Sequence, residues 1–122
     1  MKRVAWIVLI LGAHLSCAAK YCIVVSQETA KHKEWAKVVS VIKEKHSAEV
    51  LYFKKSVEES LPALRKSFPR YACFIARPEE TSKDFVKAIH RMTRRLDTDP
   101  YTDLFWGILT GHDAENALTV AK

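Results

Sequence analysis

The amino-acid sequence predicts an α/β domain: a three-layer α/β/α sandwich around a four-stranded, mostly parallel sheet, preceded by an N-terminal signal helix. Three observations predict it. The chain opens with a short basic and then apolar segment that is typical of export signals. Short continuous apolar runs then alternate with longer segments whose apolar residues recur at helical spacing. The connections between these segments are short, as expected for helical crossovers between parallel strands.

Residues 1–19 contain the three parts of a secretory signal. Lys2 and Arg3 supply the basic start, residues 4–16 are almost wholly apolar, and small residues follow up to Ala19. The apolar run is about 13 residues, whereas a helix that crosses a membrane needs roughly 20. We therefore expect a cleavable signal, cut after Ala18 or Ala19, in preference to a permanent anchor.

The expected location is outside the cytoplasm, in the periplasm or the extracellular space. The protein would meet a membrane only through the signal segment before cleavage. A lipoprotein alternative stays open, because Cys17 lies where a lipidated N-terminal cysteine could be formed. Such sites favour an aliphatic residue three positions earlier, and that position holds His14.

The charge pattern argues against a nucleic-acid partner. The formal net charge of +6 falls to +4 when Lys2 and Arg3 are removed, and the remaining positive residues are spread along the chain. Residues 20–122 are expected to form a single domain, since a chain of about 100 residues buries about two-thirds of its unfolded surface.

Four apolar runs are the expected strands. The first of them, Tyr21–Val25, is a continuous apolar run, as expected for a strand that is buried on both faces of a parallel sheet. Helical crossovers on both faces would give a sandwich of flavodoxin-like kind. The expected strands are Tyr21–Val25, Ala48–Phe53, Tyr71–Ala76 and Leu104–Leu109.

Each of the four expected helices has one apolar face. They cover residues 27–45, a short segment that starts near Ser60, the segment from Thr81 to Arg95, and the segment after Asp113. Thr81 and Asp84 form a capping-box-like start, and Asp113 can cap the last helix. The expected core residues are Trp35, Val38, Val39 and Ile42, then Leu61, Leu64 and Phe68, then Phe85, Ile89, Met92 and Leu96, then Phe105 and Trp106, and finally Ala114, Ala117, Leu118 and Ala121.

The candidate ligand-binding residues follow the strands directly. Ligands of open parallel sheets gather beyond the carboxyl ends of the strands, and that edge offers Ser26, Arg77, His112 and Asp113. His112 could act as a general base at a helix start, but no nucleophile is visibly paired with it, so we favour a loop residue beside the cap. The edge has no glycine-rich phosphate cradle, so no nucleotide cofactor is expected.

Neither the cysteines nor the acidic cluster predicts a reactive centre. Cys22 and Cys73 lie inside apolar strand runs, which favours buried thiols, with a disulfide as the second reading and catalysis as the last. Asp97, Asp99 and Asp103 lack the glycine and distal glutamate of a calcium loop, so we expect a turn and no metal site.

A basic helix end is the remaining feature. It comprises His90, Arg91, Arg94 and Arg95. We interpret it as a solvated face, with binding of an acidic partner as the alternative.

One stretch resembles the gingipain-like cysteine peptidases of the caspase-like α/β superfamily. It consists of Pro69–Ala76 and Asp99–Gly111, which provide a Pro-Arg-Tyr-led apolar strand and an acidic turn before a glycine-containing strand. In that family a His-Gly pair and a later cysteine form the catalytic dyad. Here Gly111 and His112 stand in the reverse order and no cysteine follows Cys73, so the resemblance assigns no catalytic residue.

The expected function follows from the signal, the alternating pattern and this resemblance. We expect an exported, gingipain-like α/β domain that lacks its own dyad and is not proteolytic alone. The last helix reaches Lys122 without a stop signal, which suggests the front part of a larger protein whose C-terminal peptidase portion would be its partner. Two alternatives stay open: a freestanding periplasmic ligand-binding or protein-interaction module, and a small hydrolase that uses His112.

Overall fold

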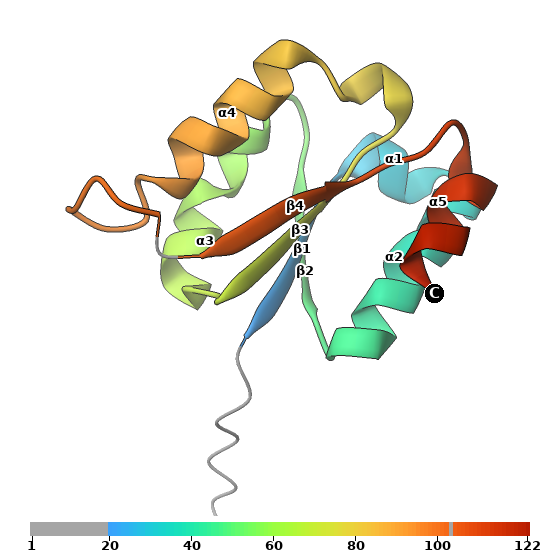
Figure 1. Ribbon diagram of the computed structural model, residues 1–122, viewed down its shortest axis with the longest axis horizontal. Coiled ribbons are helices and arrows are strands. Elements are labelled where there is room, and N and C mark those ends of the chain that lie inside the picture. Colours follow the sequence, from blue (N-terminus) through green and yellow to red (C-terminus); the bar gives the residue numbers. More distant parts are fainter. Residues whose placement is uncertain (1–19, 103) are drawn as a thin grey trace, which may run out of the picture.

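A four-stranded sheet, parallel throughout, forms the centre of the protein in the computed structural model, which describes residues 20–102 and 104–122 (Figure 1). The sheet order is β2-β1-β3-β4, and helices cover both of its faces. The predicted α/β sandwich is therefore confirmed, while the predicted signal helix lies outside the described residues. The strands are β1 (Tyr21–Ser26), β2 (Glu49–Phe53), β3 (Tyr71–Ile75) and β4 (Phe105–Leu109).

One face of the sheet is covered by α1 (Gln27–Lys31), α2 (Lys33–His46) and α5 (Ala114–Ala121). The sequence predicted one helix over residues 27–45, and the structure corrects this to two helices. The break is at His32, whose backbone is extended, with φ −71° and ψ 121°. The chain breaks here because α1 is a single short turn capped by Ser26 at the carboxyl edge of the sheet, and α2 must turn from there onto the sheet face.

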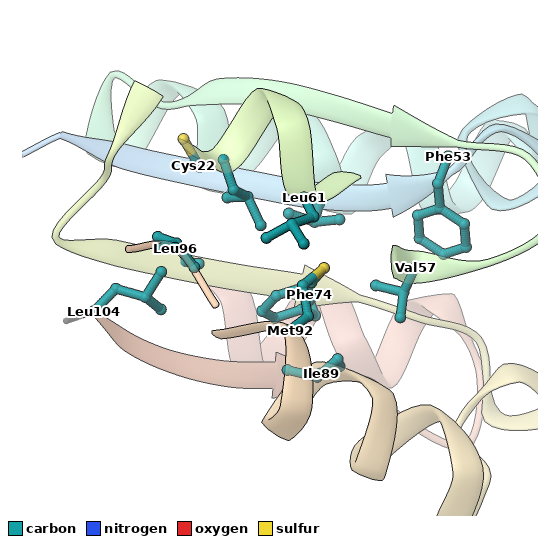
Figure 2. Close-up of a cluster of buried hydrophobic side chains, with 12 residues drawn as sticks. Cys22, Phe53, Val57, Leu61, Phe74, Ile89, Met92, Leu96 and Leu104 are labelled. Atoms are coloured by element: carbon teal, nitrogen blue, oxygen red, sulfur yellow. The ribbon is translucent and has the colours of Figure 1, made fainter. Parts of the chain in front are cut away.

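The other face is covered by a 3-10 turn η1 (Val57–Ser60), α3 (Leu61–Ser67) and α4 (Lys83–Thr93). Figure 2 shows the buried side chains that they enclose against the sheet, with Phe74 at the centre. Phe74 packs edge-to-face on Trp106, with ring centroids 6.1 Å apart. A second 3-10 turn, η2 (Pro78–Glu80), connects β3 to α4.

Three local predictions are wrong. Ser82 caps α4 by accepting from the backbone N–H of Phe85, whereas the hydroxyl of Thr81 donates to the carbonyl of Arg77. Phe68 is 46% exposed, because it ends α3 in the left-handed conformation (φ 43°) and so turns away from the core. Phe105 is 67% exposed, because it starts an edge strand beyond the cover of the helices.

The acidic turn forms as predicted where it is described. Asp97 accepts from the backbone N–H of Asp99 at 3.0 Å, and Asp99 accepts from that of Tyr101 at 2.8 Å. These are the local side-chain-to-backbone bonds by which aspartate stabilises turns. Asp103 lies outside the described residues. Among the residues that are described, no helix is long and apolar enough to cross a membrane.

Candidate functional site

At the carboxyl edge of the sheet, the connections that follow the neighbouring strands β1 and β3 run to opposite faces of the sheet. After β1 it passes to α1 and α2 on one face, and after β3 it passes through η2 to α4 on the other. Such a point in a parallel sheet opens a crevice that proteins use to bind ligands. Ser26 ends β1 and Arg77 follows β3, so two of the predicted residues lie here.

Arg77 is the centre of a charge network in this crevice. Its side chain is 13% exposed and ion-pairs with Glu79 at 3.0 Å, and with Glu28 and Glu80 at 3.4 Å. Its Nη1 lies 3.2 Å from Nε2 of His32. Because a guanidinium can only donate, that imidazole nitrogen accepts, which assigns the proton of neutral His32 to Nδ1.

Glu80 joins the two sides of the crevice. Its carboxylate accepts from the hydroxyl of Thr29, a residue with no exposed surface, and from the backbone N–H of Arg77 at 3.1 Å. Desolvation raises the pKa of Glu80, but hydrogen bonds from Thr29, Ser26 and Arg77, with the nearby guanidinium, outweigh it and hold the pKa below its usual value. Glu80 is therefore an ionised anchor between the α1 side and the α4 side.

Two hollows flank this network. The first has a volume of about 430 Å³, and its lining includes three of the four predicted residues, Arg77, His112 and Asp113. Ser26, the fourth, is buried beside it and caps α1. The first hollow is completed by His32, Glu34, Trp35, Pro78, Glu79 and Ala114. The second, of about 400 Å³, is lined by Phe53, Lys55, Ser56, Val57, Glu58, Glu80, Ser82, Asp84, Phe85, Ala88 and Arg91.

His112 and Asp113 enter the first hollow from the loop before α5. Asp113 caps this helix by accepting from the backbone N–H of Asn116 at 2.8 Å. His112 is exposed, and its backbone N–H donates to the side chain of Asn116 at 3.3 Å. Gly111 permits this tight loop, since a Cβ there would lie 2.8 Å from the backbone nitrogen of Ala117. The predicted cap is confirmed.

The two described thiols are free and buried. Cys22 pairs with Ala72 and Cys73 pairs with Ile23, so the thiols occupy successive positions of the ladder and point to opposite faces of the sheet. The disulfide considered from the sequence is therefore wrong. Burial raises the pKa of Cys73 to about 11 and is also the main cause of the raised pKa of Cys22. Both are far from the thiolate form that attacks substrates.

The described residues contain no group of three or more histidine, cysteine, aspartate or glutamate side chains arranged to hold a metal ion. Comparison with protein-family models, curated proteins and solved structures yields no match for this chain. The resemblance to gingipain-like peptidases therefore stays a prediction.

Sequence reasoning missed the residues that hold Arg77. Thr29 and Glu80 are 51 positions apart, and only the adjacency of β1 and β3 brings them together. A partial signal was present, because Ser26 and Thr29 have the spacing of a helix cap and Glu80 lies three residues after Arg77 at a strand exit.

Proposed function

We propose that this chain is an exported α/β binding module, gingipain-like in its lineage and without a dyad of its own, that holds a small cationic ligand beside Arg77. The observation that carries the proposal is the hollow of about 430 Å³ at the crevice of the sheet, next to a fixed and charge-saturated arginine. Concave sites at this position are where α/β sheets bind small molecules.

The charge around the hollow favours a cation. Three carboxylates line it, those of Glu34, Glu79 and Asp113, against the single guanidinium of Arg77. That guanidinium is also paired with Glu28 and Glu80, so it offers no free positive charge to an anion. Among the described residues, the carboxylate of Glu34 and the second oxygen of Asp113 have no partner, and an amine or guanidinium group could bind them through charge-assisted hydrogen bonds.

The non-catalytic part of the proposal is supported by the thiols. Cys22 and Cys73 lie in the two cores, one on each face of the sheet, and not at the edge that carries His112. The gingipain-like part is supported by the pairing of β3 with β4, since the two stretches that carry the resemblance lie side by side.

A titration of the isotope-labelled protein, residues 20–122, tests the binding site. Agmatine and putrescine are the probes, with glutarate as the anionic control. We expect saturable amide shifts at His32, Arg77 and His112 with the diamines only. Asp113→Asn keeps a capping side chain but removes one charge, and it should weaken binding about threefold to tenfold. The matched control is Glu115→Gln, on the exposed side of α5. Shifts that do not saturate, or equal shifts with glutarate, would refute the cation site.

Export is tested separately. Expressed with residues 1–19 in a secreting bacterial host, the protein should be recovered outside the cytoplasm with a mass that starts at Ala19 or Lys20. A mature end at a lipidated Cys17 would favour the lipoprotein alternative. Full-length protein retained in the cytoplasm would contradict export.

A further inference from the structure

A second surface, independent of the ligand hollow, lies along β4. This strand is at the edge of the sheet and, among the described residues, pairs only with β3 (Figure 1). At its start, the backbone N–H of Phe105 donates to the carbonyl of Arg70 at 2.8 Å. At its end, the carbonyl of Leu109 accepts from Ala76 at 3.1 Å. Both of these β4 residues therefore direct backbone groups toward β3.

The alternation of a parallel ladder gives the direction of the remaining groups. The backbone groups of Phe105, Gly107 and Leu109 are directed at β3. The N–H and C=O of Trp106 and Ile108 therefore point the opposite way, in the plane of the sheet and away from β3. Within the part of the chain that the structure describes, these groups have no hydrogen-bond partner, and unpaired backbone groups along a sheet edge can recruit another strand.

Three of the features that protect sheet edges, namely charge, proline and a bulge, are absent from β4 itself. Natural sheets blunt their edges with charged residues, proline, bulges or a covering segment. The sequence of β4 is Phe-Trp-Gly-Ile-Leu, with no charge and no proline. Its pairing with β3 is regular from Phe105 to Leu109, without a bulge.

A hollow of about 340 Å³ runs beside this edge, between β4 and α4. Its lining is Trp106 with Val86, Lys87, His90 and Arg91. Trp106 and Val86 provide an apolar floor, and the lining contains no carboxylate. Arg91 pairs with Glu58 at 3.7 Å, but both side chains are well exposed, so this pair is weak and leaves the surface basic.

This charge distinguishes between the possible occupants. Two copies that paired their β4 edges about a two-fold axis would place both α4 helices on the same face of the joined sheet, with like charges facing each other. A segment with carboxylates would instead meet cations along its length. Binding of an acidic partner was also the alternative interpretation of the basic end of this helix, which includes His90 and Arg91.

We propose that the β4 edge of this protein accepts an extended acidic segment of another polypeptide as a fifth strand. The segment bonds to the outward backbone groups of Trp106 and Ile108. It places an apolar side chain in the hollow beside Trp106 and its carboxylates against Lys87 and Arg91. Strand addition of this kind takes its affinity from main-chain bonds and its specificity from alternate side chains.

The test uses three fluorescein-labelled heptapeptides, with anisotropy as the measurement on the purified protein. The first, Thr-Glu-Thr-Val-Thr-Glu-Thr, presents its glutamates and its valine on the same face of a strand, the second has lysine in place of each glutamate, and the third is the acidic peptide with alternate amides N-methylated. We expect the acidic peptide to bind about tenfold tighter than the basic one. N-methylation of the edge that faces β4 should remove binding, because it removes the donors of the new ladder.

Two variants locate the site. Ile108→Pro removes an outward N–H without taking a bond from β3, and should abolish binding of the acidic peptide. The double change Lys87→Glu and Arg91→Glu should reverse the preference toward the basic peptide. The matched control is Lys37→Glu on α2, on the opposite face of the sheet, which should leave binding unchanged.

The outcomes are separable. Equal binding of the acidic and N-methylated peptides would overturn the proposal even if Ile108→Pro did not fold. Self-association of the protein that Ile108→Pro removes, without peptide binding, would overturn it in favour of a second copy. Circular dichroism of each variant verifies folding.

Discussion

The guanidinium of Arg77 is surrounded by carboxylates whose total negative charge exceeds its single positive charge. Glu28, Glu79 and Glu80 all pair with it, but they differ in exposure, and the side chain of Glu80 is only 18% exposed. Partly buried ion pairs that also make hydrogen bonds contribute more than exposed pairs, because solvent screens them less. Glu80 is therefore the partner on which the geometry of the crevice depends.

Glu80→Gln should destabilise the protein by roughly 2 kcal/mol at pH 7, because a neutral amide replaces a carboxylate that accepts several hydrogen bonds. The folded pKa of Glu80 is depressed, so its stabilisation is fully present above the unfolded value of 4.5 and is lost as the pH falls through the folded pKa. Urea unfolding of wild type and variant should therefore differ at pH 7 and converge at lower pH.

The matched control is Glu79→Gln, whose side chain is 63% exposed and whose loss should change stability by less than about 1 kcal/mol. Equal effects of the two substitutions, or a difference that does not shrink in acid, would contradict this role for Glu80.

At the scale of elements, the two glycines near β4 differ in what surrounds their backbone. A Cβ at Gly107 meets nothing within 4 Å, whereas a Cβ at Gly111 meets Asn116 at 2.7 Å and the backbone of Ala117 at 2.8 Å. Gly107 therefore has open space beside it in the strand. Gly111, in contrast, allows the loop to pass close to the capped start of α5.

The same substitution should therefore have opposite signs at the two glycines. Gly107→Ala should stabilise the protein by roughly 0.5 kcal/mol, because alanine loses less backbone entropy in a strand. Gly111→Ala should destabilise it by about 1–3 kcal/mol, since the backbone of α5 must shift. Midpoints of urea unfolding measure both changes. Stabilisation at Gly111, or a clear loss at Gly107, would contradict this account.

At the scale of the whole molecule, two separate cores enclose the sheet. Cys22 lies in the core under α3 and α4, and Cys73 lies in the core under α2 and α5. Each thiol is therefore shielded by a different helical layer: that of Cys22 by α3 and α4, and that of Cys73 by α2 and α5.

Both thiols in residues 20–122 should react with a thiol reagent at pH 8 about a hundredfold more slowly than in denaturant, with rates that follow unfolding. The folded pKa of Cys73 is about 11, against 9.0 for the ordinary thiol, so stability from the protonated thiol is present below pH 9 and is lost between pH 9 and 11. Thermal melts across this range measure the loss. Rapid labelling of either cysteine at pH 8 in the folded protein would show that its layer is open.

The sequence by itself determined the strands, their common direction and most of the core. Continuous apolar runs such as Tyr21–Val25, separated by amphipathic helices, favour a parallel sheet with helices on both faces. The cap at Asp113 was also predictable, because capping depends on neighbouring backbone groups.

Only the tertiary structure decided the break at His32, the exposure of Phe105 and the network around Arg77. These depend on which strands become neighbours and which lie at the edge, and the order β2-β1-β3-β4 arises from packing between distant segments. The contact of Thr29 with Glu80 is an example, since no local periodicity relates residues 51 positions apart. The physical reason is that the local pattern indicates which segments form strands and helices and which faces are apolar, while strand order decides which residues become neighbours and which lie at an exposed edge.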